Sequence, residues 1–444
     1  MKRVAVVNLG CPKNQVDSEI IAGLLSSKFV LVPSPEDAEV IIVNTCGFIE
    51  DAKKESLEVI FEMTELKNRG ICEKLYVIGC LAQRYGKELL EEIPELDGVL
   101  GDGDLVKTVD LIAEHNDKKI NDKKIYTNKK IQDFIYSGDM PRKRFGPEYF
   151  AYLKIAEGCD NCCRYCAIPQ IKGRYRSRTI ESIVKEAQKL VNDGVKEIAL
   201  VAQDTTRYGL DYYGKLKLSE LLKELVKIEG LEWIRLLYCY PDAVTDELIE
   251  TIASEPKICK YVDLPLQHAD NQILKKMNRR NTAEEALALI AKFREVVPDI
   301  FIRSTFITGF PGETERQFQN LLNFVRETKL DRIGVFAYSE EENTLAAKMP
   351  DQIPLPIREE RKNRLMELQA ELAYEIQQKR VGKDIKAILE EKISDKIWLG
   401  RTEGDAPEID GQIFLEGAGC HTVGDIVTAR ITKADSYDFE GRIL

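Results

Sequence analysis

The chain has 444 residues, of which 44% are hydrophobic and 31% are charged, and its formal net charge at pH 7 is −11. This length and composition suit two or three globular domains with ordinary cores, and no long low-complexity span is present. The first residues, MKRVAVVNLG, predict a strand and lack the apolar segment and cleavage site of a secretion signal. The sequence contains no run of about 18 apolar residues, so it predicts no membrane span.

The first 120 residues alternate predicted strands with predicted helices. Apolar, β-rich runs occupy residues 3–10, 38–46 and 74–80, and a helical pattern follows each of them. Alternation of this kind favours a parallel α/β sheet. We therefore predict an N-terminal α/β domain over residues 1–120.

Three cysteines, Cys11, Cys46 and Cys80, stand where these three strands end. Loops at the carboxyl ends of parallel strands converge on one crevice, so the three thiols are expected to meet. The chain has 11 cysteines, an odd number, and no secretion signal. This usage indicates thiols for metal or redox chemistry in a reducing, cytoplasmic setting, and not a disulfide framework.

A polar, lysine-rich stretch follows, and we interpret residues 121–150 as a linker. Residues 117–178 carry 15 Lys or Arg against 7 Asp or Glu. Two interpretations stay open with equal weight: a solvated segment, or a docking belt for an acidic or nucleic-acid partner.

From residue 151 the strand–helix pattern resumes for about six units, which predicts a partial (β/α)6 barrel over residues 151–375. Its working face would be the carboxyl ends of its strands. From residue 376 to 444 the pattern changes to short strands with glycine turns, which predicts a small β-barrel.

The segment EGCDNCCRYCAIP, residues 157–169, places Cys159, Cys162, Cys163 and Cys166 on one loop after the first barrel strand. Two spacings are open, because either Cys162 or Cys163 could be the middle ligand of three. Three thiolates are one short of a closed tetrahedral zinc site. A 4Fe–4S cube takes four ligands, so three thiolates would leave one iron open.

The spacing Cys-x3-Cys-x2-Cys with an aromatic residue before the last cysteine resembles the signature loop of radical S-adenosylmethionine (SAM) enzymes. This resemblance selects Cys159, Cys163 and Cys166 and leaves Cys162 as a spare. The segments LGCPKNQVDSE, NTCGFIEDAKKES and GCLAQRY resemble the second cluster-binding module of methylthiotransferases. The segments GRYRSR, QDTTRYG and DLPLQHAD are similar to the branch of that family that modifies a ribosomal protein, and the terminal barrel is like its TRAM module.

The resemblance covers the whole chain and implies a specific reaction. One 4Fe–4S cluster on the barrel loop would bind SAM and cleave it to a radical. A second 4Fe–4S cluster, on Cys11, Cys46 and Cys80, would supply the methylated sulfur. The implied acceptor is the β-carbon of one aspartate in small-subunit ribosomal protein twelve, on the assembling or assembled ribosome. The electron donor and any catalytic side chain are not indicated.

Other residues at strand ends are predicted cofactor contacts. Gln203 and Asp204 end the second barrel strand, and Arg303 lies on the fifth. Gly309 and Gly312 close the fifth strand, where glycine allows a backbone to approach a ligand. His268 also stands at a strand end, and we interpret it as structural before catalytic.

Two alternatives remain. Methylthiolation of adenosine in transfer RNA would need a basic terminal barrel, but residues 383–444 carry 8 Lys or Arg against 13 Asp or Glu. A non-catalytic, metal-bearing scaffold that docks on ribosomes would explain the thiols, but not two separate sets that are each one ligand short.

Overall fold

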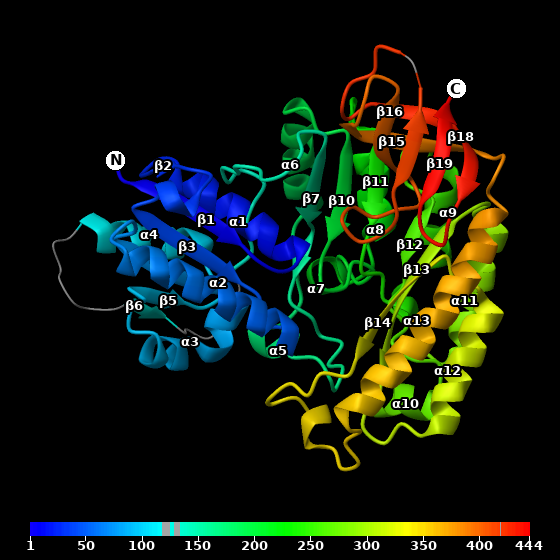
Figure 1. Cartoon of the computed structure of the whole chain (residues 1–444), viewed down its shortest axis with the longest axis horizontal. Coiled ribbons are helices and arrows are strands. Elements are labelled where there is room, and N and C mark those ends of the chain that lie inside the picture. The colour runs from blue at the N-terminus through cyan, green and yellow to red at the C-terminus, as the bar shows by residue number, and fades with distance from the viewer. Residues whose placement is uncertain (118–124, 128–133, 418) are drawn as a thin grey trace.

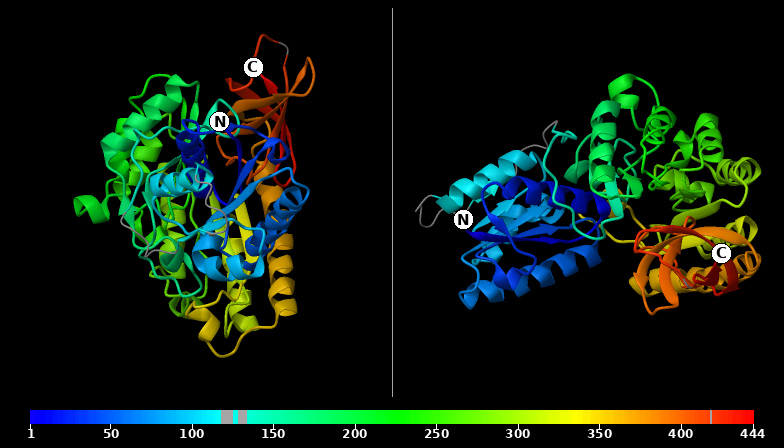
Figure 2. Two further views of the ribbon diagram at one scale, coloured as in Figure 1. Left: turned by 90° about the vertical axis from the view of Figure 1, so that its left-hand side faces the viewer. Right: turned by 90° about the horizontal axis from the view of Figure 1, so that it is seen from above.

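A computed structural model of the chain describes residues 1–117, 125–127, 134–417 and 419–444. It contains an N-terminal α/β domain, a central domain of parallel strands and helices, and a closed C-terminal β-barrel (Figure 1). The N-terminal domain lies beside the central domain, and the C-terminal barrel packs against another side of the central domain (Figure 2). The predicted fold class is therefore confirmed.

The N-terminal sheet is parallel throughout, with strand order β2-β1-β3-β4-β5-β6. Its strands are β1 (Arg3–Asn8), β2 (Val30–Leu31), β3 (Val40–Thr45), β4 (Lys74–Gly79), β5 (Gly98–Leu100) and β6 (Ile125–Thr127). Helices α1 (Pro12–Leu25) and α4 (Leu105–Asp117) share one apolar core with the sheet, and α2 (Glu50–Asn68) and α3 (Cys80–Glu92) share another. Helices thus cover both faces, as a parallel sheet requires.

Three of these strands, β2, β5 and β6, are additional to the predicted ones. Each has only two or three residues, which is too short to show a strand pattern in the sequence. Strand β6 lies inside the segment 121–150 that was interpreted as a linker. Residues 121–124 and 128–133 of that segment lie outside the described residues.

The central domain has six parallel strands: β7 (Phe150–Lys154), β10 (Glu197–Val201), β11 (Trp233–Leu236), β12 (Tyr261–Asp263), β13 (Phe301–Thr308) and β14 (Arg332–Ala337). They form two sheets, β11-β10-β7 and β12-β13-β14, and a bridge between Ile234 and Ile258 joins the sheets. Among the described strands, no pairing closes β14 onto β7, so the array is an open (β/α)6 barrel.

Six helices pack apolar side chains on these strands: α6 (Ile180–Asn192), α8 (Leu218–Leu225), α9 (Asp246–Ser254), α11 (Ala283–Val296), α12 (Glu315–Thr328) and α13 (Leu355–Gln378). Shorter elements lie in the connections: β8 (Ala156–Glu157), α5 (Ile168–Ile171), β9 (Arg176–Ser177), α7 (Leu210–Tyr213) and α10 (Asn271–Lys276). No helix in the described ranges has both the length and the apolar character to cross a membrane.

Helix α13 (Leu355–Gln378) leads from the central domain into a closed barrel of order β15-β16-β17-β19-β18. Its strands are β15 (Asp384–Lys392), β16 (Ile397–Thr402), β17 (Ile413–Glu416), β18 (Ile426–Ala434) and β19 (Phe439–Ile443). Buried ion pairs attach this barrel to the first residues of central strands: Arg401 to Glu197 at 2.5 Å, and Asp405 to Arg332 at 2.6 Å. The barrel therefore docks at the amino ends of the strands, opposite their carboxyl ends.

Four cations of residues 117–178 are internal, so neither of the two open interpretations, a solvated segment or a docking belt, holds for them. Arg142 and Arg178 contact Glu186, each at 2.7 Å or less, and Arg178 is only 2% exposed. Lys154 and Lys172 are buried as well. These charges hold the central domain to α1, α6 and the N-terminal domain and cannot dock a partner.

Candidate active site

Three thiols meet at the carboxyl end of the N-terminal sheet. Cys11 precedes α1, Cys46 directly follows β3, and Cys80 follows β4 and begins α3. The strands β1, β3 and β4 are neighbours in the sheet. The Cys80 sulfur lies 3.7 Å from Asn14 Oδ1, three residues after Cys11, and a Cβ added to Gly10, directly before Cys11, would lie 3.1 Å from the Cys46 sulfur. The structure thus brings together the three cysteines that 34 or more residues separate along the chain.

Two glycines allow this convergence. Gly10 has φ +87°, and a Cβ added to it would lie 2.6 Å from Cys46 Cβ and 3.1 Å from Cys46 Sγ. Gly79 has φ +91°, and a Cβ there would lie 2.8 Å from the Thr45 carbonyl oxygen. Only glycine combines this backbone conformation with such close approach.

Polar side chains that the sequence did not single out fix the same loops. Asn14 Nδ2 donates to the carbonyl oxygens of Leu9 at 3.2 Å and Thr45 at 3.1 Å, which ties the loop before α1 to the end of β3. The Ser56 hydroxyl donates to the Cys46 carbonyl at 2.9 Å and accepts from the Cys46 amide at 3.1 Å. The sequence signal for Asn14 and Ser56 was weak, because a single Asn or Ser near a cysteine occurs in many structural roles.

The loop between β8 and α5 carries a second group of four cysteines. The Cys159 amide donates to the Gly173 carbonyl at 3.1 Å, and the Cys166 amide to the Cys163 carbonyl at 3.1 Å. Burial raises the pKa of the Cys159 thiol to about 12. The Cys163 sulfur lies 3.8 Å from the Tyr240 hydroxyl, which comes from the segment after β11. The loop is thus folded onto the carboxyl ends of the central strands.

Cys162 differs from the other three cysteines of this loop, because it is exposed and has φ +52°. Its carbonyl accepts a hydrogen bond from Asn278 Nδ2 at 3.0 Å. The structure thus leaves Cys162 at the surface, whereas Cys159, Cys163 and Cys166 are partly buried together.

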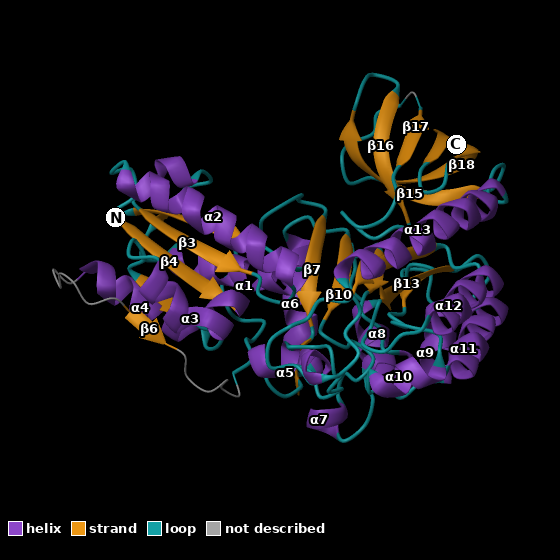
Figure 3. Ribbon diagram, turned by 60° about the horizontal axis from the view of Figure 1, so that its bottom comes forward, coloured by secondary structure: helices purple, strands orange, loops and turns teal. Residues whose placement is uncertain are grey.

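The two thiol sets lie on either side of one domain boundary. Cys80, Ala167 and Ile171 form a single buried cluster, and Ala167 directly follows Cys166 in the sequence. Helix α5 therefore joins the two sets. In Figure 3 the carboxyl ends of β3 and β4 point toward the central domain, with α5 at the boundary.

Each thiol set offers three cysteines, one fewer than a closed tetrahedral zinc site requires. A 4Fe–4S cube binds one thiolate per iron, so three thiolates suit a cube with one iron left open. Burial, followed by charge on Cys11, raises the pKa of the Cys46 thiol to about 11. Thiolates in this place need bound positive charge, which a cluster supplies.

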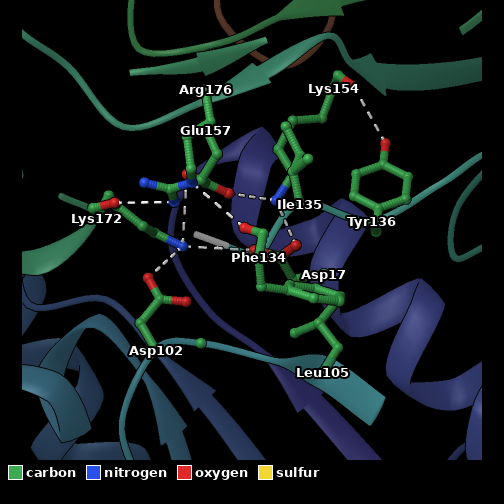
Figure 4. Close-up of a pocket in the computed structure, with 11 residues that line it drawn as sticks. Asp17, Asp102, Leu105, Phe134, Ile135, Tyr136, Lys154, Glu157, Lys172 and Arg176 are labelled. Atoms are coloured by element: carbon green, nitrogen blue, oxygen red, sulfur yellow. Dashed lines mark hydrogen bonds and ion pairs between the residues drawn. The ribbon is translucent and has the colours of Figure 1, made fainter. Parts of the chain in front are cut away.

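Buried charges fill the domain boundary beside the cysteines (Figure 4). Lys154 contacts Asp17 of α1 and Glu157 of β8, and Lys172 contacts Asp102 at 2.5 Å. They surround a cavity of about 30 Å³, which is large enough to hold water. Burial alone would lower the pKa of Lys172, but Asp102 and Glu157 hold it well above its ordinary value. Because these charges come from both domains, they lock the domains in register.

Two predicted cofactor contacts, Gln203 and Asp204, orient the cysteine loop. Gln203 Nε2 donates to Glu157 Oε1 at 2.7 Å, two residues before Cys159. Asp204 is fully buried, and its Oδ2 accepts from Asn161 Nδ2 at 2.7 Å. These bonds serve the loop, and direct contact of either residue with SAM stays a prediction.

Arg303 is the third residue of the eight-residue strand β13, so it lies far from the carboxyl end of that strand. It pairs with Asp263 at 3.4 Å and with Asp410 of the C-terminal barrel at 3.3 Å. Nothing in these contacts requires SAM, and a cofactor role for Arg303 stays a prediction.

Gly309 and Gly312, at φ +71° and +72°, do close β13. A Cβ on Gly309 would lie 2.8 Å from Arg358 Cβ, so the absence of a side chain at Gly309 allows α13 to pack closely against this loop. The Gly309 amide donates to Glu313 Oε2 at 3.1 Å. Contact of the two glycines with SAM likewise stays a prediction.

His268 is buried and fully bonded. Its Nδ1 accepts from the Asp270 amide at 2.9 Å, so its Nε2 carries the proton and donates to Glu313 at 3.1 Å. Glu313 also accepts from Arg361 at 2.8 Å. This network agrees with the interpretation of His268 as structural.

Comparison with known proteins assigns family models to all three domains. The model of the Radical SAM superfamily matches residues 153–325, that of the uncharacterized protein family UPF0004 matches residues 3–101, and that of the TRAM domain matches residues 381–444. The matched ranges contain both thiol sets and the closed terminal barrel.

Full-length relatives are similar to this chain. Proteins named ribosomal protein uS12 methylthiotransferase RimO from Desulfitobacterium hafniense and Clostridioides difficile are 52% and 46% identical. Each match covers 100% of this chain and 99% of the relative.

Solved structures share the fold at lower identity. TsrM from Kitasatospora setae, a radical SAM methyltransferase, has a TM-score of 0.56 at 16% identity, over 76% of this chain and 75% of that one. The cobalamin-dependent radical SAM enzyme OxsB has a TM-score of 0.51 at 12% identity, over 83% of this chain and 56% of that one.

Proposed function

The chain belongs to the RimO family of ribosomal protein uS12 methylthiotransferases, and from this membership we propose that it transfers a methylthio group to the β-carbon of one aspartate in uS12. Family relatives match it from end to end, so the proposal concerns the whole chain. The reaction would take place in the cytoplasm, where uS12 is made.

We assign a 4Fe–4S cluster to each thiol set: Cys159, Cys163 and Cys166 hold one, and Cys11, Cys46 and Cys80 hold the other. When bound, the two clusters and SAM supply radical generation and sulfur transfer. SAM would lie at the carboxyl ends of the central strands, near Gln203 and Gly309. The protein positions the groups and excludes water.

One observation carries this proposal: the packing of Cys80 against Ala167 and Ile171. This packing supports a common boundary for the two incomplete thiol sets, which transfer of a group between them requires. A scaffold that only docks on ribosomes would have no use for this proximity.

The chain's own residues perform defined tasks in this arrangement. Asn161, fixed by Asp204, lies between Cys159 and Cys163 and limits the conformations of the loop. The buried pairs of Lys154 and Lys172 keep the boundary closed, so that water enters the reaction space less easily.

The terminal barrel favours a protein substrate over RNA. It is acidic, with 13 Asp or Glu against 8 Lys or Arg in residues 383–444, and would repel phosphates. A protein that binds ribosomal RNA needs positive charge to neutralise phosphates, and an acidic surface attracts a basic protein.

The test is mass spectrometry of uS12 after incubation with anaerobically reconstituted enzyme, SAM and a reductant. We expect a mass increase of one methylthio group on one aspartate. Transfer RNA is offered in a parallel reaction. Modification of adenosine in the RNA, with uS12 unchanged, would overturn the proposal in favour of the transfer RNA branch.

A further inference from the structure

Lys13 is a buried cation beside the N-terminal thiols. It lies on α1, two residues after Cys11, and is 7% exposed. Its Nζ lies 3.5 Å from the centre of the Tyr238 ring. The ammonium of Lys13 is thus held against the central domain, to which Tyr238 belongs.

This cation lacks the carboxylate that the other buried lysines of the boundary have. Lys154 is paired with Asp17, and Lys172 with Asp102. Across the described residues, no carboxylate oxygen lies within 4.0 Å of Lys13 Nζ. Glu157, which lies at the same boundary, is already occupied by Lys154 and Gln203. An ammonium buried without a carboxylate partner is costly, and such groups mark functional sites.

Tyr238 holds Lys13 from the central domain and is itself strained. It follows the end of β11 with φ +60°, an unfavourable conformation for a residue with a side chain. The Tyr238 amide donates to Asp263 Oδ2 at 2.9 Å, and its carbonyl accepts from the Thr205 amide at 3.0 Å. Strain of this kind persists when surrounding contacts enforce it. The Tyr238 ring is thus fixed at the carboxyl end of the barrel, facing the N-terminal thiols.

We propose that Lys13 binds the carboxylate of the aspartate that is modified. This inference rests on the proposed function. The acceptor β-carbon is bonded directly to that carboxylate, so a cation that holds the carboxylate next to Cys11 also places the β-carbon beside the N-terminal thiols. The ion pair between Lys13 and this carboxylate would form only when the substrate binds. Asparagine at the same position has the same shape and no charge, so a substrate with asparagine would bind more weakly.

The experiment measures binding of uS12 to anaerobically reconstituted enzyme by calorimetry. Two ligands are compared: native uS12, and uS12 in which the acceptor aspartate is replaced by asparagine. With the wild-type enzyme we expect the aspartate form to bind about tenfold or more tightly. Lys13→Met is expected to abolish this preference, and Lys13→Arg to restore part of it.

Lys28→Met is the matched control, because Lys28 lies just beyond the other end of α1 and is exposed in a pair with Asp110. It should keep the wild-type preference. Iron content is measured for every variant, so that only protein with both clusters is compared.

Two results would overturn the inference. One is a Lys13→Met enzyme that still prefers the aspartate form. The other is a variant that loses iron or changes the electron paramagnetic resonance of the clusters, with the preference intact, because Lys13 would then serve the cluster. Methylthiolation of uS12 by the wild-type enzyme is scored in the same preparations, so failure of the proposed function is distinguished from failure of the Lys13 assignment.

Discussion

Alanine at Gly10 would force apart two loops that carry thiols. The added Cβ would lie 2.6 Å from Cys46 Cβ, whereas non-bonded carbon atoms pack at about 3.5–4.0 Å. One loop or both must therefore move by about 1 Å. We expect Gly10→Ala to lose the cluster of the N-terminal domain, so that the iron content falls from about eight to about four per chain. Cleavage of SAM, which depends on the other cluster, should persist.

Gly70→Ala provides the matched control, since Gly70 has φ +74° and a Cβ there would meet nothing within 4 Å. Both substitutions impose the left-handed strain of about 1–2 kcal/mol. Only Gly10→Ala displaces a thiol. The assay is iron and sulfide content after anaerobic reconstitution, with thermal unfolding as a check on stability. Full iron in Gly10→Ala would refute the reasoning, and equal loss in Gly70→Ala would assign the effect to strain.

Cys163→Ala is expected to remove the central cluster and to abolish release of 5′-deoxyadenosine. Cys162→Ala is expected to keep the cluster and the release of 5′-deoxyadenosine. An equal loss of iron and of 5′-deoxyadenosine in the two variants would contradict the ligand assignment. Glu197→Gln is expected to lower the free energy of unfolding by about 3–5 kcal/mol, because it leaves Arg235 and Arg401 buried without their carboxylate. Urea unfolding measures this, and an unchanged midpoint would count against it. Burial alone would raise the pKa of Glu197, but Arg401 and Arg235 hold it below the ordinary 4.5. The carboxylate therefore stabilises the fold above about pH 4.5 and loses this effect as the pH falls further. The difference in unfolding free energy between wild type and Glu197→Gln should accordingly narrow as the pH falls below about 4.5.

The sequence indicated the convergence of Cys11, Cys46 and Cys80 because parallel strands have one carboxyl edge, and that edge was recognisable from three apolar runs. It did not indicate that Gly10 and Gly79 permit the convergence, because a glycine in a loop has many uses. The sequence also did not predict how the two domains pack together, because this packing depends on contacts such as that of Cys80 with Ala167.

Side-chain partners were the least predictable part of the site. Asp204 and Arg303 both looked like strand-end contacts, but one binds Asn161 and the other binds Asp410, more than 100 residues away. Cys420 is exposed, although free cysteine is among the residue types that are most often buried. Composition gives the propensity of a residue to be buried, whereas only tertiary contacts decide its partner.

The account depends most on the two thiol sets facing each other across one boundary. Electron paramagnetic resonance of the doubly reduced enzyme tests this directly, because spins on neighbouring clusters interact through space with a strength that falls as the cube of their distance. Each single-cluster spectrum is recorded from a variant that lacks all three cysteines of the other set. We predict that the wild-type spectrum is broader than the sum of these two spectra. A wild-type spectrum equal to that sum would show that the clusters are too far apart for the proposed transfer.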